Sequence, residues 1–161
     1  MSKKTIYAEF PGKKDLVRAV LLEKLGSVQG DLERLTSAPS GGALAELREL
    51  LACLQRHTGE IQPAFVRDLK RDAPELFQLV EARRAQMIQR YFGRIFQDGR
   101  RDKIVRSDIP IELVVEILLI AVQGIMNPTR LEALGLTPNA GYQAIVSVVL
   151  EGVLTAKGRL K

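Results

Sequence analysis

"SDIPIELVVEILLIAVQGIMNP", residues 107–128, is the stretch that decides the fold of this chain. From Leu113 to Val122 it is apolar at nearly every position except Glu116, so a helix built from it has an apolar surface on almost every side. The pattern returns in "TPNAGYQAIVSVVLEGVLTAK", residues 137–157, where Thr137 and Pro138 are typical of a helix start. Two such helices in succession indicate a helical protein with a large apolar surface near its C-terminal end.

That apolar surface allows two arrangements. One side of each helix can pack on its own domain, which leaves the other side exposed, and a large exposed apolar patch usually marks an interface. We therefore expect a homodimer formed through helices 110–127 and 138–157, because symmetric pairs are the commonest assemblies. The alternative is that a single monomer buries both helices completely.

The rest of the chain is also helical by its periodicity, and no alternating strand pattern is persuasive. We expect helices over about 15–35 and 43–57, a short helix that starts near Pro63, and a longer one from Pro74 to a stop at Gly99. Ser107 and Asp108 are candidate caps for the helix that follows. The sequence thus predicts an all-α helical bundle of six or seven helices.

Composition narrows the functional classes. The chain has 161 residues, 46% of them hydrophobic, which is enough for one domain with its own core. Its single cysteine excludes an internal disulfide and a multi-cysteine metal site. No signal peptide or run of ~20 apolar residues is evident, so we expect a cytoplasmic protein without a membrane span.

Positive charge gathers in two parts of the chain. The net charge is +5; residues 1–24 hold six Lys/Arg against three Asp/Glu, and residues 66–106 hold eleven against six. This distribution suits a partner that carries phosphate, although solubility alone explains it equally well.

The beginning of the chain carries a family resemblance. "SKKTIYAEFPGKKDLVRAVL", residues 2–21, has a small polar residue, then Thr-Ile-Tyr, an aromatic residue, Pro and Lys in order. This string resembles the end of the DNA-binding domain of the tetracycline-repressor (TetR) family, which comprises the recognition helix, the turn and the start of the connecting helix. The apolar C-terminal pair is similar to that family's dimerisation helices.

The resemblance divides the chain into three parts. Residues 1–12 would be a truncated recognition-helix segment of a helix-turn-helix, residues 13–35 the connecting helix, and residues 43–161 the ligand-binding and dimerisation domain. It implies DNA contacts, which would fall on Lys3, Lys4, Thr5, Tyr7 and Lys13. The two helices that precede the recognition helix in the family are missing. We therefore expect residues 1–10 to lack a stable fold of their own, and DNA binding only in a longer parent protein.

The implied function is that of a ligand-responsive transcriptional regulator, most simply a repressor. The effector would be a small hydrophobic or aromatic molecule bound among the helices from 43 to 127. Candidate pocket residues are Cys53, His57, Met87, Tyr91, Phe92, Phe96, Gln123 and Met126. Each of them is also explained as ordinary core.

No enzymatic chemistry is indicated. The sequence offers no nucleophile motif, glycine-rich phosphate loop or clustered metal ligands, so we expect no catalytic residues, no metal site and no cofactor. His57 is the only histidine, and it has no partner nearby in the sequence. The alternative to a regulator is a module that binds a small molecule, or pairs with a homologue, without touching DNA.

Overall fold

The structure is a computed structural model that describes residues 10–37, 41–59 and 61–159. Over these residues every regular element is a helix, and one isolated β-bridge joins Val105 to Leu154. The all-α class predicted from the sequence is confirmed. In chain order the described elements are α2 (Lys13–Ser37), α3 (Ala43–Gly59), α4 (Pro63–Asp72), α5 (Pro74–Met87), the π-helix η1 (Ile88–Phe92), α6 (Gly93–Arg101), α7 (Ile111–Ile125), α8 (Pro128–Ala133), α9 (Pro138–Val153) and α10 (Ala156–Arg159).

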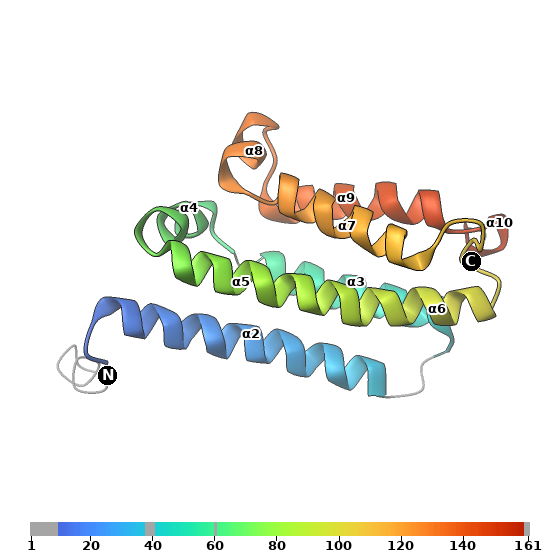
Figure 1. The fold of residues 1–161 in the computed structure, drawn as a ribbon, viewed down its shortest axis with the longest axis horizontal. Helices are drawn as coiled ribbons and strands as arrows, with labels where there is room; N and C mark the ends of the chain where they lie inside the picture. Colours follow the sequence, from blue (N-terminus) through green and yellow to red (C-terminus); the bar gives the residue numbers. More distant parts are fainter. Residues whose placement is uncertain (1–9, 38–40, 60, 160–161) are drawn as a thin grey trace.

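The helices form three layers (Figure 1). α2 lies alone on one side, α3 and the continuous helix α5–η1–α6 form the middle, and α7 and α9 form the other side. The short helices α4 and α8 contact each other at one end of the bundle. The largest fully buried side chains come mainly from the middle layer, and they are Phe92, Phe96, Leu32, Leu50, Ile95, Leu118 and Cys53.

The outer helix α2 is held mainly by its C-terminal half. Its two buried residues, Val28 and Leu32, belong to the main core. Nearer its start, Val17 and Leu21 are only partly buried, against a small separate cluster at the junction of α4 and α5. The first part of α2 therefore buries little apolar surface and is held less firmly than its second part.

Of the two apolar helices α7 and α9, only α9 begins with a side-chain cap. Thr137 caps α9 as expected, since its hydroxyl oxygen accepts a hydrogen bond from the Ala140 amide at 3.1 Å. The expected cap of α7 by Ser107 or Asp108 is wrong, because α7 begins at Ile111 without a side-chain cap. Asp108 pairs with Arg106 instead, and this hydrogen bond lowers the pKa of the Asp108 carboxyl to about 2.

The predicted helix over 138–157 is shorter in the structure. α9 ends at Val153, because Leu154 adopts an extended conformation and bridges to Val105. The Arg106 amide donates to the Val153 carbonyl at 3.0 Å, which holds this crossing in place. The chain then resumes as the separate short helix α10.

Gly99 does not end its helix, contrary to the sequence prediction. α6 continues to Arg101, and the turn that follows is made by Lys103, whose φ of 59° is left-handed. A Cβ atom on Gly99 would lie 2.7 Å from Cγ2 of Val105 and 3.3 Å from Cγ1 of Ile104. The glycine is therefore required by the close approach of the returning chain, and not by its backbone conformation.

We expect the substitution Gly99→Ala to lower the free energy of unfolding by about 1 kcal/mol. Overpacking typically costs ~1–3 kcal/mol, and the gain in helix propensity returns up to ~1 kcal/mol of that. The matched control is Gly93→Ala in the same helix, where the added Cβ meets Val115 at an ordinary 4.0 Å. Chemical denaturation should show a loss for the first variant and no loss for the second.

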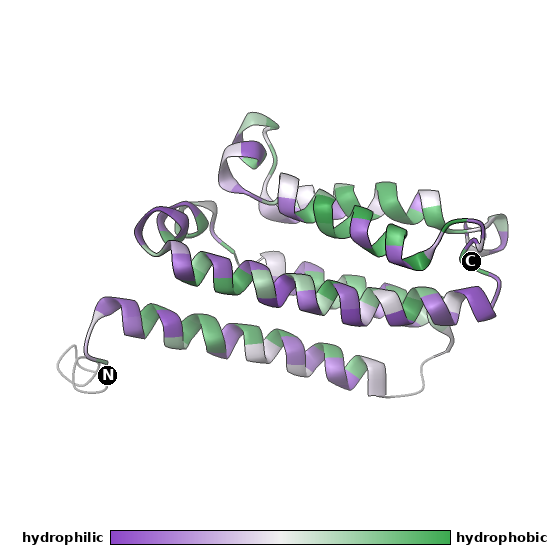
Figure 2. Cartoon of the chain, in the orientation of Figure 1, coloured by the Kyte–Doolittle hydropathy of each residue, from purple (hydrophilic) through white to green (hydrophobic). Residues whose placement is uncertain are grey.

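The hydropathy and length of the helices decide whether any of them could cross a membrane. Figure 2 shows that α7 and α9 are the most hydrophobic helices of the bundle. None of the helices that the structure describes is both long and apolar enough to cross a membrane.

Candidate ligand pocket

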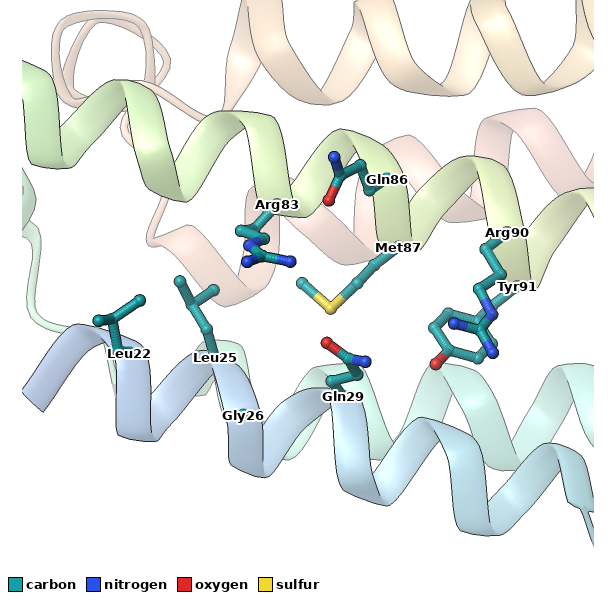
Figure 3. Close-up of a pocket in the computed structure, with 9 residues that line it drawn as sticks. All are labelled: Leu22, Leu25, Gly26, Gln29, Arg83, Gln86, Met87, Arg90 and Tyr91. Carbon is teal, nitrogen blue, oxygen red and sulfur yellow. The ribbon is translucent and has the colours of Figure 1, made fainter.

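A pocket of about 230 Å³ lies between α2 and the continuous helix α5–η1 (Figure 3). α2 lines one wall, and α5 with η1 lines the other. The lining residues are Leu22, Leu25, Gly26, Gln29, Arg83, Gln86, Met87, Arg90 and Tyr91. In Figure 3 the side chains of Leu25, Gln29 and Met87 point into the space between the two helices. The pocket is smaller than the ~300–1,000 Å³ that is usual for ligand sites, so it fits a small molecule.

Tyr91 supplies the buried polar group of the pocket. Its side chain is only 3% exposed, and its hydroxyl finds no hydrogen-bond partner among the residues that the structure describes. Burial raises the pKa of this hydroxyl, which keeps it protonated and able to donate. A buried hydroxyl without a partner costs ~1–3 kcal/mol, and a bound acceptor would remove that cost.

Two arginines give the pocket a positive mouth. The Arg90 guanidinium lies over the Tyr91 ring, 5.5 Å from its centroid, and its Nη1 is 3.7 Å from Oε1 of Glu33. Arg83 extends over Leu25 on the other side in Figure 3. Both guanidiniums are solvent-accessible, so they can turn to meet a carboxylate, sulfonate or phosphate group.

The π-helix η1 accounts for the position of Tyr91. Its wider turn interrupts the α-helix at Ile88–Phe92 and turns Ile88, Tyr91 and Phe92 all into the protein. Insertions of this kind are found frequently at functional sites. It could not be predicted from the sequence, because the five residues IQRYF are equally compatible with an α-helix.

A second pocket of about 310 Å³ lies where α4, α5 and α8 meet. Its walls are mostly apolar and include Met126, Leu131 and Leu136. Arg67 and Arg84 are the cations among its lining residues, and Arg84 forms an ion pair with Glu81 at 2.9 Å. Burial lowers the pKa of Arg84, because the surrounding protein keeps away the water that would stabilise the charged guanidinium.

The residues proposed from the sequence for the pocket do not come together at one place in the structure. Met87 and Tyr91 line the first pocket, and Met126 lines the second. Phe92 and Phe96 pack against each other in the core with tilted rings whose centroids are 5.9 Å apart, and Gln123 is exposed on α7. Cys53 and His57 lie on α3 next to Asp31 of α2, outside both pockets. The sequence did not indicate Gln29, Gln86, Arg83 or Arg90 as pocket residues, because helical periodicity shows only that they lie on polar faces of their helices.

Most of the residues proposed for DNA contact lie outside the described part of the chain. These are Lys3, Lys4, Thr5 and Tyr7. Lys13 is exposed at the first position of α2, next to the salt bridge of 2.5 Å between Lys14 and Glu75.

Comparison with known proteins identifies a solved structure of the same fold. It is the ketosteroid transcriptional regulator KstR2 of Mycobacterium tuberculosis. The match has a TM-score of 0.58 and covers 96% of this chain and 80% of the other, at 17% sequence identity. At this identity the likeness shows a shared fold. No family model matches the sequence, and no curated protein does.

Proposed function

We propose that this chain is the effector-binding and dimerisation part of a ligand-responsive transcriptional regulator of the TetR type. The effector is a small organic anion with an apolar or aromatic body, bound between α2 and α5–η1. The observation that carries this proposal is the buried Tyr91 hydroxyl without a partner, in a pocket that has arginines at its mouth. The shared fold with a transcriptional regulator supports the assignment to this class.

The chemistry of the pocket assigns a part of the ligand to each residue. Leu22, Leu25 and Met87 contact the apolar body, and the flexible Met87 side chain adapts to its shape. Tyr91 donates a hydrogen bond to an acceptor on the ligand, and Arg90 pairs with its anionic group.

The position of the pocket links binding to movement of α2. A ligand larger than the free space has to push α2 away from α5, and the first part of α2 is held by little apolar contact. Binding therefore favours a conformation in which α2 is displaced, and the shift is limited by the difference in affinity between the two conformations. In a regulator of this type, α2 is the helix that carries the signal toward the DNA-binding end.

The same function requires a dimer, and one face of the bundle suits it. Leu113, Ile117 and Ile120 are exposed on one side of α7, and Val148 is 73% exposed on the neighbouring α9. We propose that this apolar face pairs with its copy in a twofold-symmetric homodimer.

The effector site is tested by isothermal titration calorimetry with 2-naphthoate, a compact aromatic carboxylate. We expect Tyr91→Phe to weaken binding about 10-fold, because it removes one hydrogen bond worth ~0.5–1.5 kcal/mol. The same variant should raise the free energy of unfolding of the free protein by about 1 kcal/mol, because it removes an unpaired buried hydroxyl. A purely structural role for Tyr91 would move stability without moving binding.

The charge requirement is tested in the same titration. Arg90→Gln should weaken binding about 10-fold, whereas Arg18→Gln, which removes an exposed cation of α2 outside the pocket, should leave it unchanged. Hydrogen exchange should then show that 2-naphthoate changes the protection of the α2 amides. Binding that leaves α2 unchanged would favour a module without a regulatory role, and equal effects of Arg90→Gln and Arg18→Gln would contradict the site.

A further inference from the structure

Asp31, Cys53 and His57 form a cluster of three different metal-binding side chains, separate from the ligand pocket. Asp31 lies on α2, whereas Cys53 and His57 lie four residues apart on α3 and so share one face of that helix. One ligand atom from each residue lies within 4.8 Å of the other two. A pair of ligands at this spacing on one helix, with a third from a neighbouring helix, is a common way to build a metal site.

The distances are close to those that a metal ion requires. Zinc bonds of ~2.0–2.1 Å to nitrogen or oxygen and ~2.3 Å to sulfur, at tetrahedral angles, place two ligand atoms about 3.3–3.6 Å apart. Nε2 of His57 and Oδ2 of Asp31 are 2.9 Å apart. All three atoms therefore reach bonding distance after movements of about 1 Å or less, which side-chain rotation supplies.

Two buried polar groups in and beside this cluster have no hydrogen-bond partner among the residues that the structure describes. Cys53 is fully buried, and Nδ1 of His57 is buried without a hydrogen-bond partner among the described residues. The hydroxyl of Tyr142 on α9 is likewise buried and has no partner within the described part of the chain; its burial, with a smaller contribution from Cys53, raises its pKa.

Two arginines compete with a cation at this position. Arg34 hydrogen-bonds to Oδ1 of Asp31 from the neighbouring turn of α2, and Arg56 lies beside Cys53 along α3. Asp31 nevertheless keeps Oδ2, the oxygen that faces His57, for a metal. His57 and Asp31 are both partly exposed, which gives an ion a path from solvent.

We propose that Asp31, Cys53 and His57 bind a divalent transition-metal ion of the Zn²⁺ type, which ties α2 to α3. The ion replaces the hydrogen bond between Asp31 and His57: His57 binds it through Nε2 as the neutral imidazole that keeps its one ring proton on Nδ1, and any second imidazole proton and the thiol proton of Cys53 leave to solvent. The mixture of thiolate, imidazole and carboxylate ligands favours Zn²⁺ or Co²⁺ over Mg²⁺ or Ca²⁺, which prefer oxygen ligands alone.

The test uses tag-free full-length protein, reduced and stripped with a chelator, and CoCl₂ as the spectroscopic probe. Co²⁺ should produce thiolate-to-metal charge-transfer absorption at one equivalent, and Zn²⁺ should abolish it by displacement. Only Cys53 can supply that thiolate, because the chain has a single cysteine. The wild-type spectrum therefore identifies the sulfur ligand without depending on a variant that folds poorly.

Variants assign the other two ligands. We expect Asp31→Asn and His57→Asn each to weaken Zn²⁺ binding at least 10-fold in competition with Co²⁺. Glu33→Gln, two residues along α2 from Asp31, is the matched control and should bind as the wild type does. Zn²⁺ should also raise the melting temperature of the wild type, and it should do so much less for His57→Asn.

Two results would overturn the site. One is the absence of thiolate-to-cobalt absorption in excess Co²⁺, and the other is Zn²⁺ binding that Asp31→Asn and His57→Asn leave as tight as Glu33→Gln does. Both measurements are independent of 2-naphthoate, so a failure here leaves the proposed effector site untouched.

Discussion

Truncation of Phe96 to alanine should lower the free energy of unfolding by about 3–5 kcal/mol. Phe96 has no exposed surface, packs against the tilted ring of Phe92 and lies in the main core, where α6 meets α3 and α7. Removal of the ring leaves a cavity, and the helices that surround it cannot move close enough together to fill it. Because total stabilities are usually ~5–15 kcal/mol, this variant should lose a large share of the total.

The measurement is urea denaturation at one fixed protein concentration, because dimerisation would make stability depend on concentration. Phe65→Ala is the matched control: the same atoms are removed from a phenylalanine on α4 that is 43% exposed. We expect its effect to stay below about 1 kcal/mol. Equal losses for the two variants would mean that Phe96 does not hold the core together.

The second large effect is expected on assembly. Ile120→Arg should raise the dissociation constant of the homodimer roughly 100-fold or more, since an unpaired buried charge costs ~3–5 kcal/mol. Ile120 is 59% exposed in the single chain, on the same side of α7 as the exposed Leu113 and Ile117. In a twofold-symmetric interface each arginine would also lie near its copy, which adds repulsion.

Analytical ultracentrifugation at micromolar concentration separates the outcomes. The wild type should sediment at twice the chain mass of 17.9 kDa, and Ile120→Arg at the mass of one chain. Leu134→Arg is the control. It places the same charge on an exposed leucine that follows α8 and belongs to neither α7 nor α9. A wild type that stays monomeric, or a dimer that Ile120→Arg leaves intact, would contradict the proposed interface.

The sequence predicted helix positions well where local chemistry sets them. Prolines at 63, 74 and 138 each open a helix, and Thr137 caps the last of them. These signals are local, because a cap bonds an amide only a few residues away. The prolines and Thr137 marked helix starts correctly, whereas the cap expected from Ser107 or Asp108 did not form. Helical periodicity indicated the all-α class without any tertiary information.

Features that depend on a distant segment were not visible in the sequence. Gly99 looks like a helix stop, but it lies inside α6 because Val105 returns to pack on it. The length of α9 is set in the same way, by the bridge between Leu154 and Val105. In each case a neighbour from elsewhere in the chain overrides the local preference.

The candidate sites show the same division. The helix predicted from Pro74 to Gly99 contains both Tyr91 and Arg90, but the π-helix that places both beside α2 needs the packed bundle. His57 has no partner nearby in the sequence, and its partner Asp31 is 26 residues away on another helix. Sequence by itself determined which faces are apolar, where most helices begin, and that the chain is all-α. Tertiary structure alone decided which faces meet, because periodicity specifies the direction of a side chain and not the neighbour that it contacts.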